Sequence, residues 1–317
     1  MKNKIIQGDA LETLKTLPNQ YVDCVVTSPP YWGLRDYGIE EQIGLEKTPE
    51  EYVIKLVNIF KEIKRVLRKE GTVWLNLGDS YVSAKSRYSS VEQTIAGHLR
   101  NEPVSGNRPD LKGHSFLKDK DLCGIPWRVA FALQTNGWYL RQDIILSKPN
   151  PMPESVTDRC TKAHEYIFLL TKSPKYYFDS ESIKEKTLTQ DNTNRNRDNT
   201  RLNNTPGRTR MAGLKTNNYE KRNKRSVWTI TTKPFIDAHF AVFPEDLIKP
   251  MILAGCPAGG IVLDPFIGSG TTARVAMDLG RNYLGIELNP AYIKLGDKRT
   301  AQQVIFMPTP KRKVKGK

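Results

Sequence analysis

A strand, a glycine-rich turn and a helix follow one another between residues 261 and 279, and this order constrains the fold more than any other feature of the chain. The apolar run 261–263, which leads to Asp264, predicts a buried strand. Gly268 and Gly270 let the backbone approach a ligand closely, and the positive end of the helix expected over 271–279 faces this turn. The pattern predicts a ligand site at the carboxyl end of a strand in an α/β sheet.

A second strand, expected over 282–286, leads directly to Glu287. A carboxylate some twenty residues after a glycine turn is the usual partner of ribose hydroxyls in a nucleoside-binding strand–helix–strand unit. Taken alone, the unit fits a nicotinamide dehydrogenase as well as an S-adenosylmethionine site, and many glycine turns bind nothing. A second motif is needed to choose between them.

The tetrapeptide Ser28-Pro29-Pro30-Tyr31 supplies that motif, directly after the valine-rich run 22–27. Two prolines cannot continue a strand ladder, so we expect a rigid loop at the strand's carboxyl end. Prolines lack an N–H, and the loop therefore offers carbonyl oxygens, a hydroxyl and an aromatic face. Such a set suits the exocyclic amino group of an extruded base, although an isolated Pro-Pro turn is more often structural.

Together, the two motifs resemble those of the DNA amino-methyltransferases of the β arrangement, in which the catalytic motif precedes the cofactor motif. The SPPY form is typical of site-specific N4-cytosine enzymes from restriction-modification systems and phages. Further segments that fit this family are Gly8-Asp9, 71–79, 143–151, 164–170 and 238–244. The resemblance implies an α/β fold with a doubly wound, mostly parallel, Rossmann-like sheet and basic loop insertions.

The resemblance also implies the site residues and the cofactor, S-adenosylmethionine. The catalytic residues would be Ser28, Pro29, Pro30 and Tyr31. The cofactor-binding residues would be Asp9, Asp264, Phe266, Gly268, Gly270, Thr271 and Glu287. Weaker candidates for the base pocket are Trp32, Asn76 and Asp79. Lys148 and Asn150 are weaker still, because a KPNP stretch is more often a structural turn. No metal ion is required.

The chemistry expected of this set is positioning rather than covalent catalysis. The cofactor carries its own activated methyl group. Hydrogen bonds from the target amino group to the Ser28 hydroxyl and the Pro29 carbonyl would localise the nitrogen lone pair for attack, while Tyr31 and Trp32 would stack on the base. The expected reaction is methyl transfer to N4 of cytosine in double-stranded DNA.

Four cysteines, Cys24, Cys123, Cys160 and Cys256, are scattered through the chain without a CxxC pair. This spacing predicts neither a disulfide framework nor a zinc site, and Cys24 and Cys256 lie in apolar segments typical of a core. None follows a proline, whereas methylation at carbon 5 of cytosine uses the thiolate of a Pro-Cys dipeptide. That chemistry is disfavoured.

The net charge of +15 is unevenly distributed along the chain. Residues 184–225 hold twelve Lys or Arg against four Asp or Glu, and the tail 311–317 holds five Lys or Arg. Such segregation indicates contact with a phosphate backbone, although a solvated loop has the same composition. No apolar stretch approaches the roughly 18 residues of a membrane span, and no signal peptide is evident, so we expect a cytoplasmic protein.

Periodicity predicts helices near 9–17 and over 126–136. A third helix is expected to begin at Pro49, after the capping residue Thr48, and to be stopped by Gly71. Strands are expected over 72–77, 138–147 and 164–171. The predicted catalytic domain comprises 1–82, 123–182 and 226–310, interrupted by a loop insertion at 83–122 and by the basic segment 184–225, a target-recognition candidate.

Three alternatives remain open. The same fold acting on adenine N6 is the nearest, although such enzymes more often carry Asp at the position of Ser28. A nicotinamide dehydrogenase would explain the glycine turn but not the SPPY loop or the basic segment. A non-catalytic DNA-binding protein would explain the charge but not the nucleoside-type turn. The recognised sequence, a companion nuclease and the oligomeric state are not predicted.

Overall fold

A computed structural model describes residues 1–34, 38–39, 42–82, 114–186, 220–231 and 243–301. Within them an eight-stranded sheet has the order β1-β10-β9-β2-β3-β5-β4-β8. Its strands are β1 (Lys4–Gln7), β2 (Val22–Thr27), β3 (Leu67–Leu77), β4 (Tyr139–Ser147), β5 (His164–Thr171), β8 (Val227–Thr229), β9 (Ile261–Asp264) and β10 (Asn282–Glu287). Only β5 runs antiparallel to its neighbours, which confirms the mostly parallel sheet.

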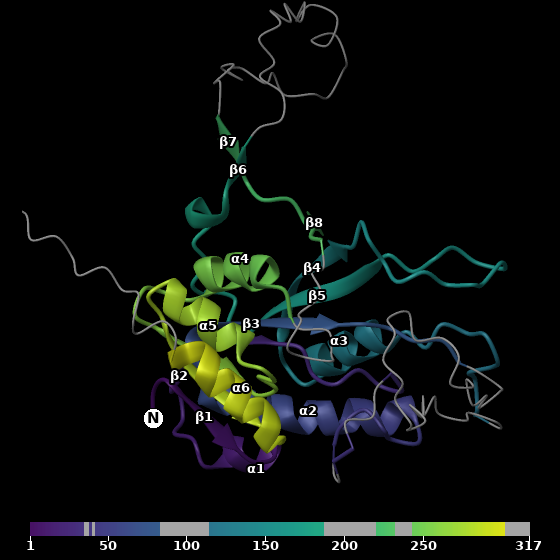
Figure 1. Cartoon of the computed structure of the whole chain (residues 1–317), viewed down its shortest axis with the longest axis horizontal. Helices are drawn as coiled ribbons and strands as arrows, with labels where there is room; N and C mark the ends of the chain where they lie inside the picture. Colours follow the sequence, from purple (N-terminus) through teal and green to yellow (C-terminus); the bar gives the residue numbers. More distant parts are fainter. Residues whose placement is uncertain (35–37, 40–41, 83–113, 187–219, 232–242, 302–317) are drawn as a thin grey trace, which may run out of the picture.

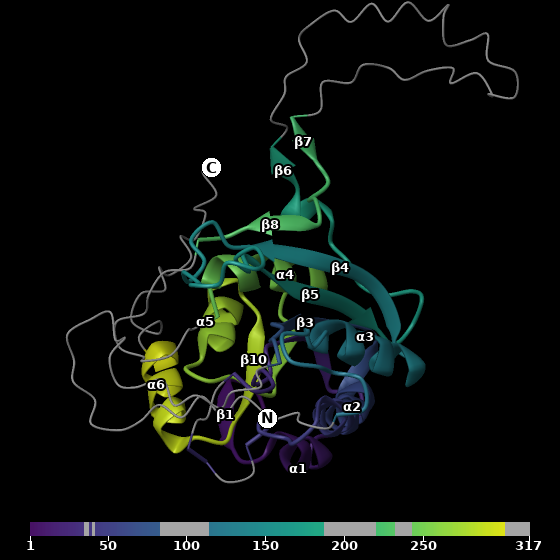
Figure 2. The same cartoon turned by 90° about the vertical axis from the view of Figure 1, so that its right-hand side faces the viewer.

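Helices cover both faces of this sheet (Figures 1 and 2). They are α1 (Ala10–Lys15), α2 (Pro49–Val66), α3 (Ile125–Thr135), α4 (Glu245–Gly255), α5 (Thr271–Asp278) and α6 (Pro290–Ala301). One hydrophobic cluster joins α1, α2 and α3 to one face, and a second joins α4 and α5 to the other. Two such layers confirm the doubly wound architecture.

The central strand β2 is buried along its whole length, as expected of a strand covered by helices on both faces. Its Asp23 carboxylate accepts a hydrogen bond from the Ile261 backbone N–H at 2.8 Å and pairs with Arg68 at 2.5 Å. Cys24 and Cys256 are fully buried, as the sequence predicted for core residues. These contacts tie β2 to β9 and β3 and fix the middle of the sheet.

The start of α2 is as predicted, but its end is not. The Thr48 hydroxyl accepts from the Glu51 N–H at 3.2 Å, which caps the helix. The prediction that Gly71 stops the helix is wrong, because α2 ends at Val66 and β3 begins at Leu67, with Gly71 inside the strand. A Cβ at position 71 would lie 2.9 Å from the Asp23 carbonyl oxygen, so glycine permits close strand packing there.

The basic segment is described only at its two ends. There β6 (Glu185–Lys186) and β7 (Lys221–Arg222) form a separate antiparallel hairpin (Figure 1). Residues 187–219, most of the insertion 83–122, part of 238–244 and the tail 311–317 lie outside the described residues. Among the described helices, none combines the length and apolarity needed to cross a bilayer.

We expect Gly255→Ala to destabilise the fold. Alanine is favoured over glycine in a helix by up to about 1 kcal/mol. At this position, however, its Cβ would overlap Thr72 Oγ1 and Trp74 Nε1, where the Thr72 hydroxyl donates to the Gly255 carbonyl at 3.1 Å. Overpacking costs about 1–3 kcal/mol, so the clash should win. Chemical denaturation should show a lower free energy of unfolding for this variant. Lys249→Ala, at an exposed position on the same helix, is the control. A Gly255 variant more stable than the wild type would contradict this packing.

Candidate functional site

The SPPY loop leaves the carboxyl end of β2, where the sheet brings the predicted catalytic and cofactor residues to one edge. Pro29 is buried, and the Pro30 carbonyl accepts from the Tyr52 hydroxyl at 2.9 Å. The Gly33 N–H donates to the Gly44 carbonyl at 2.8 Å, which closes the loop behind the tetrapeptide. The loop is therefore held on α2 and on its own return segment.

Tyr31 lies at the centre of a polar cluster built from separate segments. Its hydroxyl donates to Glu165 Oε2 at 2.9 Å and accepts from the Asn76 amide. The Ser28 hydroxyl donates to the same Tyr31 oxygen at 3.3 Å. The ring lies against Gly78, where an added Cβ would fall 2.5 Å from Cε2. The ring and the hydroxyl of Tyr31 are therefore both fixed beside Ser28.

Glu165 is a functional candidate that sequence reasoning missed. It lies near the start of β5. Its carboxylate forms an ion pair with Lys148, the residue after β4, and Glu165 Oε2 accepts a hydrogen bond from Asn76 Nδ2 at 3.0 Å. Burial raises the pKa of Glu165, but the Lys148 cation and the donors Asn76 and Tyr31 outweigh it and hold that pKa below its usual range. The antiparallel pairing of β4 and β5 brings Lys148 close to Glu165. The spacing of these two residues in the sequence does not predict this ion pair.

The weaker base-pocket candidates divide into two groups. Asn76 belongs to the polar cluster, and its buried Oδ1 has no hydrogen-bond partner among the described residues. Trp32 is only 2% exposed and donates to the Glu46 carbonyl at 2.9 Å, so the structure places it in the core instead of an open pocket. The Asp79 carboxylate accepts from the backbone N–H groups of Gly124 and Ile125 at 3.1 and 3.0 Å, which caps α3.

The glycine turn after β9 has the geometry of a ligand cradle. Gly268 has φ +53°, and an added Cβ there meets nothing within 4 Å, so open space lies beside it. Gly270 has φ +82° and a different role, because an added Cβ would fall 2.7 Å from the Gly296 Cα of α6. Arg299 of α6 donates to the Thr271 hydroxyl at 2.8 Å. Helix α6 thus supports the turn from behind and leaves the Gly268 side open.

Asp264 braces this turn from inside the protein. It is 3% exposed, its Oδ1 accepts from the Thr27 hydroxyl at 2.8 Å and the Phe266 N–H at 3.1 Å, and its Oδ2 accepts from the Thr272 hydroxyl at 2.6 Å. Burial raises the pKa of Asp264 to about 6 despite these hydrogen bonds. The sequence predicted Asp264 among the cofactor-binding residues, and its contacts here are to protein groups that shape the site.

Glu287 ends β10 beside the open side of the turn. Its Oε2 accepts from the Gly268 N–H and its Oε1 from the Asn289 N–H, both at 2.8 Å. Burial raises the pKa of Glu287. Each carboxylate oxygen has a second lone pair, so both can still accept from a diol. The Gly8 N–H donates to the Glu287 carbonyl. The next residue, Asp9, caps α1, because its side chain accepts a hydrogen bond from the Glu12 N–H at 3.0 Å. These acceptor oxygens and the space at Gly268 fit a nucleoside with free ribose hydroxyls.

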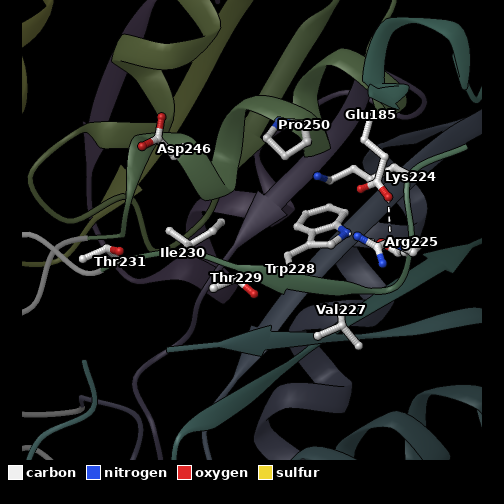
Figure 3. Close-up of a pocket in the computed structure, with 10 residues that line it drawn as sticks. All are labelled: Glu185, Lys224, Arg225, Val227, Trp228, Thr229, Ile230, Thr231, Asp246 and Pro250. Carbon is white, nitrogen blue, oxygen red and sulfur yellow. Dashed lines mark hydrogen bonds and ion pairs between the residues drawn. The ribbon is translucent and has the colours of Figure 1, made fainter. Parts of the chain in front are cut away.

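A hollow at the base of the β6–β7 hairpin lies apart from these residues (Figure 3). Lys224 Nζ stands 4.9 Å from the centroid of the Trp228 ring, and Trp228 donates to the Arg225 carbonyl at 2.7 Å. Glu185 accepts from Arg222 and Arg225 at 2.8 and 2.6 Å. None of the predicted catalytic or cofactor residues lines this hollow, whose walls come from the two ends of the basic segment, from residues 227–231 and from α4.

The family model described as DNA methylase, for N6 and N4 enzymes, matches residues 22–298. The chain belongs to this family. It is 48% identical over 295 residues to the type II methyltransferase M.Cfr9I of Citrobacter freundii, which covers 93% of this chain and 86% of the relative. It is 46% identical to the type II methyltransferase M.SmaI of Serratia marcescens, with coverage of 93% and 90%. The predicted DNA amino-methyltransferase of restriction-modification type is confirmed.

Solved structures share the fold of this methylase. The cytosine-N4-specific PvuII DNA methyltransferase aligns with a TM-score of 0.62 at 18% identity, over 98% of this chain and 88% of the other. A Thermus thermophilus protein in complex with S-adenosyl-L-methionine aligns with a TM-score of 0.58 at 22% identity, over 96% of both chains. The family uses S-adenosylmethionine as its methyl donor, so the cofactor prediction is confirmed and the dehydrogenase alternative is excluded.

We expect Glu287→Ala to weaken S-adenosylmethionine binding without DNA or metal present. The substitution removes the predicted acceptor for two ribose hydroxyls, at about 1–3 kcal/mol for hydrogen bonds to a charged group. Titration calorimetry would measure the dissociation constant. Asp278→Ala is the control, since it removes a carboxylate on α5 whose partner is Arg274 rather than the turn. Unchanged affinity in the Glu287 variant would remove this residue from the cofactor site.

Proposed function

We propose that this methylase transfers a methyl group from S-adenosylmethionine to the exocyclic N4 of cytosine at a specific site in double-stranded DNA. The observation that carries the proposal is the placement of the Ser28 hydroxyl beside Tyr31. Ser28 directly follows Thr27, whose hydrogen bond to Asp264 joins the SPPY loop to the glycine turn. The N6 of adenine is the alternative target, since the same acceptors suit its amino group.

Ser28 and Pro29 would act on the target amino group. The amino lone pair is delocalised into the base ring, and hydrogen bonds from the amino protons to the Ser28 hydroxyl and the Pro29 carbonyl would localise it on nitrogen. Because the Ser28 hydroxyl donates to Tyr31, its lone pairs are oriented to accept. A neutral hydroxyl at this position, where adenine enzymes more often carry Asp, favours cytosine.

Tyr31 would bind the extruded base through its ring. Its hydroxyl contacts and its position against Gly78 hold the ring in one orientation, which lowers the entropic cost of binding a flat partner. Trp32 is not part of this proposal, because it is buried. The bound cofactor would supply the activated methyl group, and Asp9, Phe266, Gly268 and Glu287 would hold it, with Asp264, Gly270 and Thr271 supporting their backbone.

The basic segment 184–225 would contact DNA and contribute to target recognition. At its described base, Lys186 and Lys221 stand directly opposite each other across the hairpin. Like charges in this arrangement destabilise a hairpin, and a bound phosphate would relieve their repulsion. A cytoplasmic location and a companion nuclease that cuts the same site complete the proposal.

We expect the product to be 4-methylcytosine. DNA from cells that express the protein, digested to nucleosides, would be analysed by mass spectrometry. Ser28→Ala should abolish most of the product while S-adenosylmethionine affinity stays near that of the wild type, because the hydroxyl addresses the base. Exclusive 6-methyladenine would refute the cytosine assignment and leave the fold, the cofactor and the SPPY loop in place. No methylated nucleoside at all would overturn the proposed activity.

We expect the double variant Lys186→Ala, Lys221→Ala to bind duplex DNA with a weaker salt dependence. Each phosphate contact contributes about 0.9 to the slope of log affinity against log salt concentration, so the slope should fall by up to about 1.8. Lys61→Ala, Lys69→Ala is the matched control, because both lysines are exposed and lie outside the basic segment, on α2 and near the start of β3. An unchanged slope in the hairpin variant would move the DNA contact elsewhere, with 83–122 as the next candidate.

A further inference from the structure

Ser28, Tyr31 and Glu165 form a continuous hydrogen-bonded chain that ends on a carboxylate. Ser28 Oγ donates to the Tyr31 hydroxyl at 3.3 Å, and that hydroxyl donates to Glu165 Oε2 at 2.9 Å. The two hydrogen bonds therefore run in one direction, from Ser28 toward Glu165. The first bond is longer than the usual 2.7–2.8 Å, as is common in catalytic hydrogen bonds before the substrate is bound.

Positioning the amino group does not complete the proposed reaction, because a proton must also leave. As the amino nitrogen bonds to the methyl carbon, the methyl–sulfur bond breaks and its electron pair stays on sulfur. The nitrogen then holds two protons, the methyl group and a positive charge that has lost its conjugation with the ring. Such a cation is a strong acid, and it must release one proton to give the neutral methylated base.

We propose that this proton leaves through Ser28 and Tyr31 to Glu165, which is its terminal acceptor. This proposal rests on the proposed function. Ser28 Oγ takes one proton from the nitrogen and passes its own to the Tyr31 oxygen, which in turn passes its own to Glu165 Oε2. Both hydroxyls are regenerated, and one neutral glutamic acid is formed. That acid then returns its proton to solvent, and no oxidant, metal or further reactant is needed.

The surroundings of Glu165 keep it ionised and ready to accept. The Lys148 ammonium holds Oε1, while Asn76 Nδ2 donates to Oε2 at 3.0 Å. Lys162 is a second cation that interacts with Glu165, and its Nζ donates to the Asp79 carbonyl at 2.7 Å. Tyr31 is itself a poor proton source, because burial and the neighbouring carboxylate raise its pKa well above the usual range. Tyr31 can therefore pass a proton on without resting as a phenolate.

Glu165→Gln tests this role with little change of shape. With S-adenosylmethionine and DNA saturating, the single-turnover methylation rate should fall about 100-fold, within the range of general acid–base effects. Calorimetry should show unchanged cofactor affinity, and fluorescence of 2-aminopurine at the target position should show that base extrusion persists. Glu154→Gln is the matched control, because it breaks the ion pair with Arg159 at 2.5 Å in the loop before β5 without touching Tyr31. Its rate should equal that of the wild type.

Tyr31→Phe and Lys148→Met separate proton transfer from structural support. Tyr31→Phe cuts the chain, so its loss should not add to that of Glu165→Gln in the double variant. Lys148→Met removes the cation that keeps Glu165 ionised at low pH. In this variant the methylation rate should therefore begin to fall at a pH about one unit higher than in the wild type. A purely structural ion pair would not cause this shift.

A wild-type rate in Glu165→Gln, or a pH profile that Lys148→Met leaves unchanged, would overturn the relay. Additive losses in the Tyr31 and Glu165 variants would do the same. Each of these results presupposes that the wild-type protein makes a methylated base. Absence of any product from the wild type would instead overturn the proposed function, so the two failures are distinguishable.

Discussion

The buried carboxylate of Asp264 is the interaction on which the rest of the site depends. Through one side chain it binds the Thr27 hydroxyl at the end of β2, the Phe266 N–H of the glycine turn and the Thr272 hydroxyl in the first turn of α5. The SPPY loop and the glycine turn are thereby joined at the centre of the sheet. Burying a carboxylate is costly unless it is fully hydrogen-bonded, which is why three donors converge on this one.

The proposed catalytic site is assembled around this centre from strands that run in opposite directions. β2 and β3 deliver Ser28, Tyr31 and Asn76 at their carboxyl ends, whereas β5 runs antiparallel and delivers Glu165 near its amino end. A single reversed strand therefore places a carboxylate among groups that would otherwise be hydroxyl and amide only. The ion pair with Lys148 offsets part of the cost of that charge and leaves Oε2 directed at Tyr31.

Much of the architecture follows from local pattern. The strand–turn–helix unit from Ile261 to Asp278, the capped start of α2 and the placement of the SPPY loop after β2 were all predicted, because strands, caps and glycine turns are specified by neighbouring residues. Gly71 was misread for the same reason. Glycine commonly ends a helix, but here it is required by the Asp23 carbonyl of another strand, which no local window contains.

The sequence by itself determined the family, the order of its two motifs and the chemistry of the Ser28 and Glu287 side chains, since these depend on residue type and short-range spacing. Only the tertiary structure decided which side chains share a site. It buried Trp32, turned Asp79 into a helix cap, made Asp264 an internal brace and brought Glu165 to Tyr31. The Tyr31–Glu165 and Thr27–Asp264 hydrogen bonds join residues 134 and 237 positions apart, and they arise from strand order and direction, which local sequence does not encode.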